Sequence, residues 1–231
     1  YACGITQRVA DAVSIPVMIK VTPQVTDLVA FSGRLKEAGA SAVTLTNRFI
    51  GFVPDIETGK PFIYGQAGIG GPWIKPLTLR WINEVRQAFK DDLYIAGTNG
   101  AYDWRDIVQF IMSGAHIVEM CAAVMAYGYD WMGKQVQGLE KYMDEKGYAT
   151  ISDMLGIASD AAMQYSEMPY EKAKVNPELC TNCGRCLKVC FQDAMQPGEA
   201  STWVRQEDCI GCGGCFSVCP VPGAIDIFVH Q

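Results

Sequence analysis

Short apolar runs recur along the first 165 residues and predict the strands of a buried β-sheet. The runs span residues 17–21, 42–46, 93–96 and 117–120. They show little alternation of apolar and polar positions, which is typical of parallel strands that are covered on both faces. The pattern therefore predicts a parallel sheet.

Between these runs, apolar residues follow the 3.6-residue period of amphipathic helices. Thr26 and Asp103 are suited to cap helix N-termini. Gly39 and Gly114 suit the turn from a helix into the next strand. The four predicted helices span residues 26–39, 78–89, 103–114 and 130–145.

Repeated strand–helix units predict an α/β fold, either a Rossmann-like sheet or a (β/α)8 barrel. Only four such units fit into the first 165 residues, whereas a complete barrel needs eight units and about 250 residues. Four parallel strands alone would also leave unpaired edges. The chain is therefore expected to form an open sheet or half of a barrel.

Polar residues and glycines gather where the predicted strands end. Since the carboxyl ends of parallel strands share one edge, this edge would be the active face of a barrel, and its loops commonly hold a phosphate. Lys20 is notable because an unpaired ammonium that ends a buried strand is costly. The strand-end residues are Lys20, Thr22, Thr46, Asn47, Arg48, Gly68, Gly70, Gly71, Gly97–Gly100, Cys121, Ala122 and Ala123.

Composition narrows the class of protein further. The chain has 49% apolar and 19% charged residues and a net charge of −6, and the lack of a long basic run argues against a nucleic-acid partner. No apolar stretch reaches the roughly 18 residues of a membrane span, and no signal-peptide pattern is present, so we expect a cytoplasmic protein. Tyr1 stands in place of Met, which indicates a start inside a longer protein.

Eight of the ten cysteines form two copies of one motif. Each copy reads C-x2-C-x2-C-x3-C, and the copies are offset by 29 residues. Three closely spaced thiolates can ligate one [4Fe–4S] cluster, and in two-cluster ferredoxins the fourth ligand comes from the last Cys of the other motif. The predicted ligand sets are Cys180, Cys183, Cys186 and Cys219 for one cluster, and Cys209, Cys212, Cys215 and Cys190 for the other.

Zinc and disulfides are the alternatives for this block. A zinc ribbon uses two separated C-x2-C pairs around one ion, and the third Cys of each copy does not fit that arrangement. Disulfides suit small secreted domains, but most of this chain reads as a large α/β unit with only Cys3 and Cys121. The spacing favours clusters, and with them one-electron transfer.

Several stretches resemble the dihydroorotate dehydrogenase superfamily, and within it the dihydropyrimidine dehydrogenase branch with its iron–sulfur subunit. They are residues 20–23 (KVTP), 46–47 (TN), 71–76 (GPWIKP), 125–129 (MAYGY) and 154–158 (MLGIA), followed by the cysteine motifs. The resemblance implies an FMN-binding (β/α)8 barrel whose C-terminal part is residues 1–165, a linker at 166–178 and a two-cluster ferredoxin-like domain at 179–231. The upstream half, with the family's proton-donor Cys, would precede Tyr1, and Cys3 is not assigned that role.

The resemblance also implies residue roles. Lys20 would stabilise reduced, anionic flavin at its N1/O2 edge. Cys121 and Ala122 would offer backbone N–H groups to the FMN phosphate, and we expect the Cys121 thiol itself to be an inert, buried group. The other implied contacts are Gly71, Asn99 and Gly100 for FMN, and Asn47 and Arg48 for the substrate.

The function implied is an FMN- and iron–sulfur-dependent oxidoreductase that acts on the CH–CH bond of a small unsaturated substrate. An FAD- and NAD(P)H-binding or other electron-donor subunit would be its partner in a homo- or hetero-oligomer, because no G-x-G-x-x-G motif places a nicotinamide on this chain.

Two departures from the family pattern leave alternatives open. Asn99 replaces a glycine, although Asn tolerates positive φ. Arg48 replaces a small hydroxyl residue and suits an acidic substrate. A third reading is a non-catalytic electron-transfer subunit, because the predicted barrel is incomplete.

Overall fold

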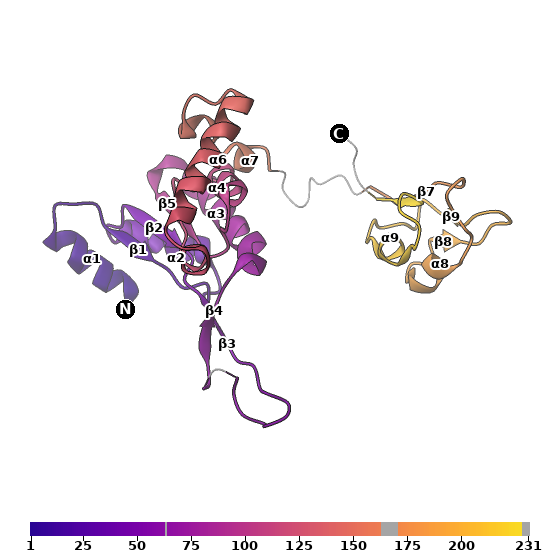
Figure 1. Ribbon diagram of the computed structural model, residues 1–231, viewed down its shortest axis with the longest axis horizontal. Helices are drawn as coiled ribbons and strands as arrows, with labels where there is room; N and C mark the ends of the chain where they lie inside the picture. Colours follow the sequence, from indigo (N-terminus) through magenta and orange to yellow (C-terminus); the bar gives the residue numbers. More distant parts are fainter. Residues whose placement is uncertain (63, 163–170, 228–231) are drawn as a thin grey trace. The chain divides into compact units, whose positions relative to one another are not determined.

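The computed structural model describes residues 1–62, 64–162 and 171–227. The chain divides into two units, Tyr1–Ala162 and Met163–Gln231. We call the first the sheet unit and the second the cysteine unit, and we describe each by itself (Figure 1).

A four-stranded parallel sheet is the centre of the sheet unit. Its strands are β1 (Met18–Lys20), β2 (Ala42–Leu45), β5 (Tyr94–Thr98) and β6 (Ile117–Glu119), in the order β1-β2-β5-β6. All neighbouring strands pair in parallel, which confirms the sheet predicted from the four apolar runs. The strand order follows the chain without the reversal of a doubly wound sheet, so the architecture fits part of a barrel better than a Rossmann-like fold.

Four helices occupy the predicted stretches, and two of them, α2 and α3, begin at other residues than predicted. They are α2 (Leu28–Glu37), α3 (Lys75–Phe89), α4 (Trp104–Met112) and α6 (Asp130–Lys146). Asp27, and not Thr26, caps α2, because its carboxylate accepts from the N–H of Ala30 at 2.8 Å. α3 begins three residues earlier than predicted, since Pro76 is tolerated in a first helical turn. Within the described ranges, no helix is long and apolar enough to cross a membrane.

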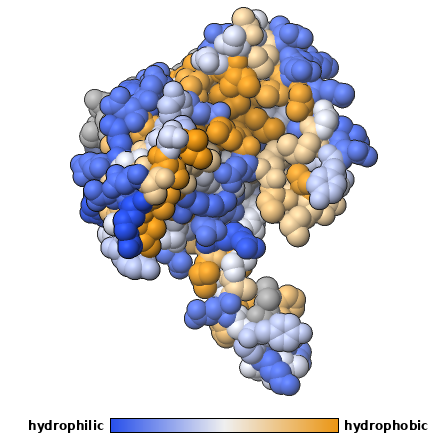
Figure 2. Space-filling model, turned by 90° about the vertical axis from the view of Figure 1, so that its left-hand side faces the viewer, coloured by the Kyte–Doolittle hydropathy of each residue, from blue (hydrophilic) through white to orange (hydrophobic). Residues whose placement is uncertain are grey.

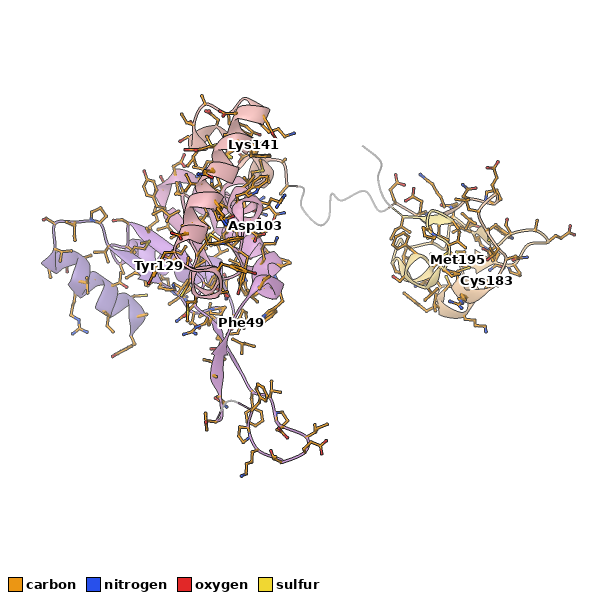
Figure 3. All side chains as sticks on the ribbon, in the orientation of Figure 1. Phe49, Asp103, Tyr129, Lys141, Cys183 and Met195 are labelled. Atoms are coloured by element: carbon orange, nitrogen blue, oxygen red, sulfur yellow. The ribbon has the colours of Figure 1, made fainter. Side chains whose placement is uncertain are left out.

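Other elements of this unit carried no clear sequence signal. β3 (Phe49–Gly51) and β4 (Ala67–Ile69) pair as a hairpin that projects away from the sheet and its helices (Figure 1). Phe49 lies at the base of the hairpin (Figure 3). Its ring stacks on that of Trp81, with ring centroids 5.8 Å apart. The remaining elements are α1 (Ala2–Ala12), η1 (Pro72–Ile74), η2 (Lys90–Asp92), α5 (Ala122–Tyr127), η3 (Ile151–Met154) and α7 (Ile157–Asp160).

The core of the sheet unit lies between the sheet and the helices. Leu35, Ile82 and Phe110 are fully buried and pack in one cluster with Val43 and Leu45 of β2. Burial of apolar surface stabilises a fold by about 25 cal/mol per Å². This core therefore fixes the strands, and with them the positions of their carboxyl ends.

The opposite face of the sheet carries polar residues toward its carboxyl ends. The register aligns Lys20 with Thr44, Thr44 with Ala96 and Ala96 with Ile117, so these side chains share one face. Nearer the amino ends this side exposes Met18 and Ile117. Seen from the side of α1, apolar residues reach the molecular surface (Figure 2).

The cysteine unit repeats its elements at the offset of its cysteine motifs. α8 (Arg185–Val189) and α9 (Gly214–Val218) begin 29 residues apart, as do β7 (Lys174–Val175) and β9 (Trp203–Val204). β7 pairs with β10 (Ile225–Asp226), and β8 (Met195–Gln196) pairs with β9, each pair antiparallel. Met195 lies in the interior of this unit (Figure 3).

The predicted linker, residues 166–178, overlaps the folded cysteine unit. Residues 166–170 lie outside the described residues. Residues 174–175 form β7 and pair with the last strand of the cysteine unit, so the folded unit begins ahead of residue 179. A two-residue strand is too short to leave a periodic signal, which is why the sequence placed this boundary late.

Candidate functional sites

A cleft opens at the carboxyl ends of the four parallel strands. It encloses about 1310 Å³ of space, part of it open to solvent. The structure brings every residue predicted to contact flavin or substrate into the wall of this cleft, although these residues come from four separate strand ends. They are Lys20, Asn47, Arg48, Gly71, Asn99, Gly100, Cys121 and Ala122.

Lys20 meets a carboxylate that the sequence analysis missed. Its Nζ lies 3.0 Å from Oε2 of Glu119, and Thr44 Oγ1 donates to Glu119 Oε1 at 3.3 Å. The cost of an unpaired, buried ammonium does not apply to Lys20, since its side chain is 47% exposed and paired. Glu119 ends its strand as Lys20 does, which is the signal that could have revealed it.

This ion pair also reports the shape of the sheet. β1 and β6 are its two outer strands, and in a flat sheet they would lie about 14 Å apart, because neighbouring strands are about 4.8 Å apart. Side chains leave a sheet roughly at right angles. A direct contact between Lys20 and Glu119 therefore indicates a sheet that curls toward the cleft, as the strands of a barrel do.

The glycines at the cleft make room for close approach. A Cβ on Gly70 would lie 2.5 Å from Oδ1 of Asn99, and one on Gly100 would lie 2.7 Å from Cα of Lys75. Asn99 adopts φ +74° and Gly100 φ +127°. Asn99 thus adopts the positive φ that Asn was expected to tolerate at this position.

An ion pair beneath this loop holds it in place. Nζ of Lys75 donates to Oδ1 of Asp106 at 2.6 Å, and Oδ2 of Asp106 accepts from the backbone N–H groups of Tyr102 and Asp103. Burial works to raise the pKa of Asp106, but the hydrogen bonds from Lys75 and Tyr102 outweigh it and hold that pKa below its ordinary value. The sequence did not indicate this pair, because its partners are 31 residues apart.

Thr46 supplies the clearest sign that the cleft accepts a ligand. Thr46 lines the cleft, and its hydroxyl is buried and has no hydrogen-bond partner among the described residues. A buried polar group without a partner is costly. The orphaned hydroxyl, the glycine-lined wall and the Lys20 ammonium together fit a large polar group with an aromatic ring, such as FMN.

Asn47 and Arg48 line the cleft, and both residues are exposed. Oδ1 of Asn47 accepts from the backbone N–H of Arg48 at 2.9 Å, which is a loop-capping contact. The Arg48 side chain lies against the backbone of Gly68. A Cβ added to Gly68 would lie 3.2 Å from Nε of Arg48. In the described part of the chain, the Arg48 guanidinium has no ion-pair partner.

Cys121 differs from the expectation of a buried thiol. The residue is exposed, and its Sγ lies 3.9 Å from Sδ of Met125. It stands at the N-cap of α5, and Ala122 is the first residue of that helix. The short β6–α5 connection leaves the Cys121 side chain in the open cleft, which sequence periodicity could not show.

The cysteine unit contains two cavities, each lined by one of the two predicted ligand sets. We call them the Cys180 site, with Cys180, Cys183, Cys186 and Cys219, and the Cys209 site, with Cys190, Cys209, Cys212 and Cys215. All ten cysteines of the chain are free of disulfides. Across the described residues, no three or more His, Cys, Asp or Glu side chains are arranged to hold a metal ion directly. Four thiols around a cavity fit a cubane cluster better than one zinc ion.

The two sites give their thiols different surroundings. Burial works to raise the pKa of Cys180, but backbone N–H groups of Asn182 and Thr202 outweigh it and hold that pKa below its usual value. Burial raises the pKa of Cys215. Cys186 and Cys215 are the buried member of each set, with 6% and 8% exposure.

These features define an α/β chain with a barrel-type cleft and a dicluster unit. Residues 2–143 match the family described as dihydroorotate dehydrogenase, and residues 173–227 match the 4Fe-4S dicluster domain. The chain belongs to the dihydroorotate dehydrogenase family. Together the two matches support FMN and two [4Fe–4S] clusters as its cofactors, and the cleft and the thiol-lined cavities fit them.

Two relatives illustrate the range of this likeness. The chain is 36% identical over 158 residues to the catalytic subunit of dihydroorotate dehydrogenase B (NAD(+)) from Methanothermobacter thermautotrophicus, covering 68% of this chain and 52% of that protein. It is 27% identical over 203 residues to the NAD-dependent dihydropyrimidine dehydrogenase subunit PreA of Escherichia coli K12, covering 83% and 49%. The chain thus spans about half the length of these relatives.

Proposed function

We propose that this chain is part of a cytoplasmic oxidoreductase of the dihydropyrimidine dehydrogenase type. Single electrons from a partner subunit, one that binds FAD and NAD(P)H or another donor, would be relayed between the cysteine unit and the cleft. A small unsaturated substrate would exchange hydride there across a CH–CH bond. When bound, FMN supplies both hydride and one-electron exchange, which joins the two kinds of chemistry. The names of the relatives, a catalytic subunit and a subunit PreA, support a multi-subunit enzyme.

The observation that carries this proposal is the Lys20 ammonium on the curled face of the sheet. It lies in a cleft with a glycine-lined wall and an orphaned Thr46 hydroxyl. A fixed cation at that place favours negative charge that develops on a bound ring. Glu119 and Thr44 hold the ammonium in position through the contacts at 3.0 and 3.3 Å.

The other residues of the cleft have separate tasks in this proposal. Gly71, Asn99 and Gly100 let the backbone approach the ribityl chain and phosphate of FMN. Cys121 and Ala122 offer backbone N–H groups to that phosphate. The amide of Asn47 faces the substrate, with its Oδ1 partly engaged by Arg48 N–H. In the cysteine unit, each set of four thiolates would ligate one [4Fe–4S] cluster.

The test compares two lysines of the sheet unit in protein purified without denaturation. We expect wild-type protein to carry FMN, and Lys20→Met to lower substrate reduction by about 100-fold, the usual scale for loss of one electrostatic stabiliser. Lys90→Met is the matched control, because Lys90 pairs with Asp160 at 2.9 Å outside the cleft. Wild-type protein without FMN, or equal activity in all three proteins, would contradict the proposal.

A second candidate keeps the scaffold and changes the substrate. The Arg48 guanidinium lines the cleft and has no ion-pair partner among the described residues, and a guanidinium suits a carboxylate or phosphate. We infer that an acidic unsaturated compound is the substrate in this case. Arg48→Thr should then lose activity on acidic compounds and keep it on neutral ones, and unchanged selectivity would remove this candidate.

A further inference from the structure

The internal repeat of the cysteine unit provides a matched pair of sites within one chain. The 29-residue offset that relates Cys180 to Cys209 also relates Thr202 to Ala173. Ala173 donates its backbone N–H to Sγ of Cys209 at 3.3 Å, and Thr202 likewise offers its backbone N–H to Cys180. The two positions are therefore structurally equivalent, and they differ only in their side chains.

The side chain at this position reaches the thiols in one site alone. Thr202 Oγ1 lies 3.7 Å from Sγ of Cys180 and 3.6 Å from Sγ of Cys186. Thr202 is 2% exposed, so water does not compete for this hydroxyl. The methyl group of Ala173 offers nothing comparable to the Cys209 site.

At two more equivalent positions, the Cys180 site has a polar or charged side chain and the Cys209 site does not. Thr181 and Arg185 line the Cys180 site, whereas their equivalents at the Cys209 site are Ile210 and Gly214. The other lining residues of the Cys209 site are mostly apolar, with Val189, Phe191, Ala194, Met195 and Val204. Gln192 is the exception there, but it is exposed and, among the described residues, makes no hydrogen bond to a cysteine sulfur.

We propose that the two cluster sites are unequal, and that the Cys180 site accepts an electron at a higher reduction potential than the Cys209 site. Hydrogen bonds to cluster-ligating sulfur and nearby positive charge both stabilise the reduced, more negative cluster. Solvent exposure does not account for the difference, because the most buried thiol of each site is similarly covered. This inference depends on the proposed [4Fe–4S] sites. It means that a single electron added to the two clusters would occupy the cluster in the Cys180 site.

The experiment is a redox titration of the cluster-loaded protein, followed by electron paramagnetic resonance. We expect two separate one-electron steps. Thr202→Val keeps the shape of the side chain and removes its hydroxyl. It should lower the equilibrium constant for reduction of the cluster in the Cys180 site by about tenfold, so the reduction potential of the higher-potential step should fall by about 59 mV. Ala173→Ser adds a hydroxyl at the equivalent position and should raise the reduction potential of the lower-potential step. Either variant brings the two steps closer together.

Two further variants keep the test decisive if Thr202→Val does not assemble its clusters. Thr202→Ser retains the hydroxyl and should titrate like the wild type, while Arg185→Gln should lower the same step as Thr202→Val. Two equal steps in the wild type, or a shift of the lower-potential step in Thr202→Val, would overturn the inequality. Iron and sulfide contents below two [4Fe–4S] clusters in the wild type would overturn the proposed function, and the inference with it.

Discussion

The cleft of the sheet unit and the cavities of the cysteine unit are built in opposite ways. The cleft joins side chains that are far apart in sequence, such as Lys20 and Glu119, which are 99 positions apart. The cavities draw their thiols from two short motifs that lie 29 residues apart. A cleft of the first kind depends on a finished fold, whereas the second kind depends mainly on local spacing.

The two cores show the same contrast. The sheet unit buries a cluster of apolar residues between sheet and helices, and none of them is a predicted ligand. In the described part of the cysteine unit, the core cluster has five buried residues, and two of these, Cys186 and Cys215, are predicted cluster ligands. We therefore expect the sheet unit to keep its cleft without a cofactor, and the cysteine unit to need its clusters to complete a small core.

Removal of iron is the strongest test of this contrast. We expect chelation under reducing conditions to unfold the cysteine unit and to leave the sheet unit folded. Metal ligation in small domains contributes on the order of 10 kcal/mol to folding, which is more than five buried core residues supply. Hydrogen exchange followed by mass spectrometry should show lost protection in residues 171–227 and unchanged protection in residues 1–162.

Matched serine variants separate ligation from a general loss of thiols. Cys215→Ser should reproduce the unfolding of the cysteine unit, whereas Cys3→Ser, in the sheet unit and outside both ligand sets, should not. If residues 171–227 stayed protected after all iron was removed, the core of this unit would be self-sufficient and the contrast would fail.

The same contrast explains what could be predicted from the sequence. Local patterns predict the strands, their parallel pairing and the two thiol sets, because apolar runs and cysteine spacing can be recognised without knowledge of the fold. Glu119 ends its strand as Lys20 does and could have been named as a candidate, but its contact with Lys20 depends on the curl of the sheet that brings the ends of β1 and β6 together. Lys75 and Asp106 meet for a similar reason, through the packing of α3 beside α4.

Short elements were also beyond prediction. β7 and β10 are two residues each, so they offer no period to detect. The hairpin of β3 and β4 lies in a stretch that read as a long glycine-containing loop. Its exposed Ile50 departs from the burial that apolar residues in a strand usually show.

Asp106→Asn tests whether the cleft is held by the fold, and its expected effect is smaller than that of iron removal. Loss of the charged hydrogen bonds from Lys75 and two backbone N–H groups should cost about 1–3 kcal/mol of unfolding free energy. It should also weaken FMN binding, because the loop of Asn99 and Gly100 rests on Lys75. Asp160→Asn, which breaks an exposed ion pair with Lys90, should cost less than about 1 kcal/mol.

The pH dependence of this variant has a defined sign. The pKa of Asp106 is lowered in the folded state, so its contribution is complete above about pH 4 and is lost as pH falls through the folded pKa. Denaturant unfolding of the sheet unit should therefore show the two proteins converging only in strong acid. Equal stability of Asp106→Asn and wild type at pH 7 would mean that the loop is held by other contacts.

The smallest expected effect is that of His116 on the pH dependence of stability, and it concerns the sheet unit alone. Burial, and then the nearby charge of Arg86, lowers the pKa of His116 below its ordinary value, and its Nδ1 accepts from the N–H of Ile95 at 3.1 Å. As pH falls below about 6.5, the unfolded chain takes up a proton that the folded unit refuses, so unfolding free energy falls by at most about 1.4 kcal/mol per pH unit. His116→Gln keeps an acceptor for Ile95 and removes the titration, so its stability should change less between pH 7 and pH 5 than that of the wild type. Parallel curves for the two proteins in this window would show that His116 is not the group that senses acid.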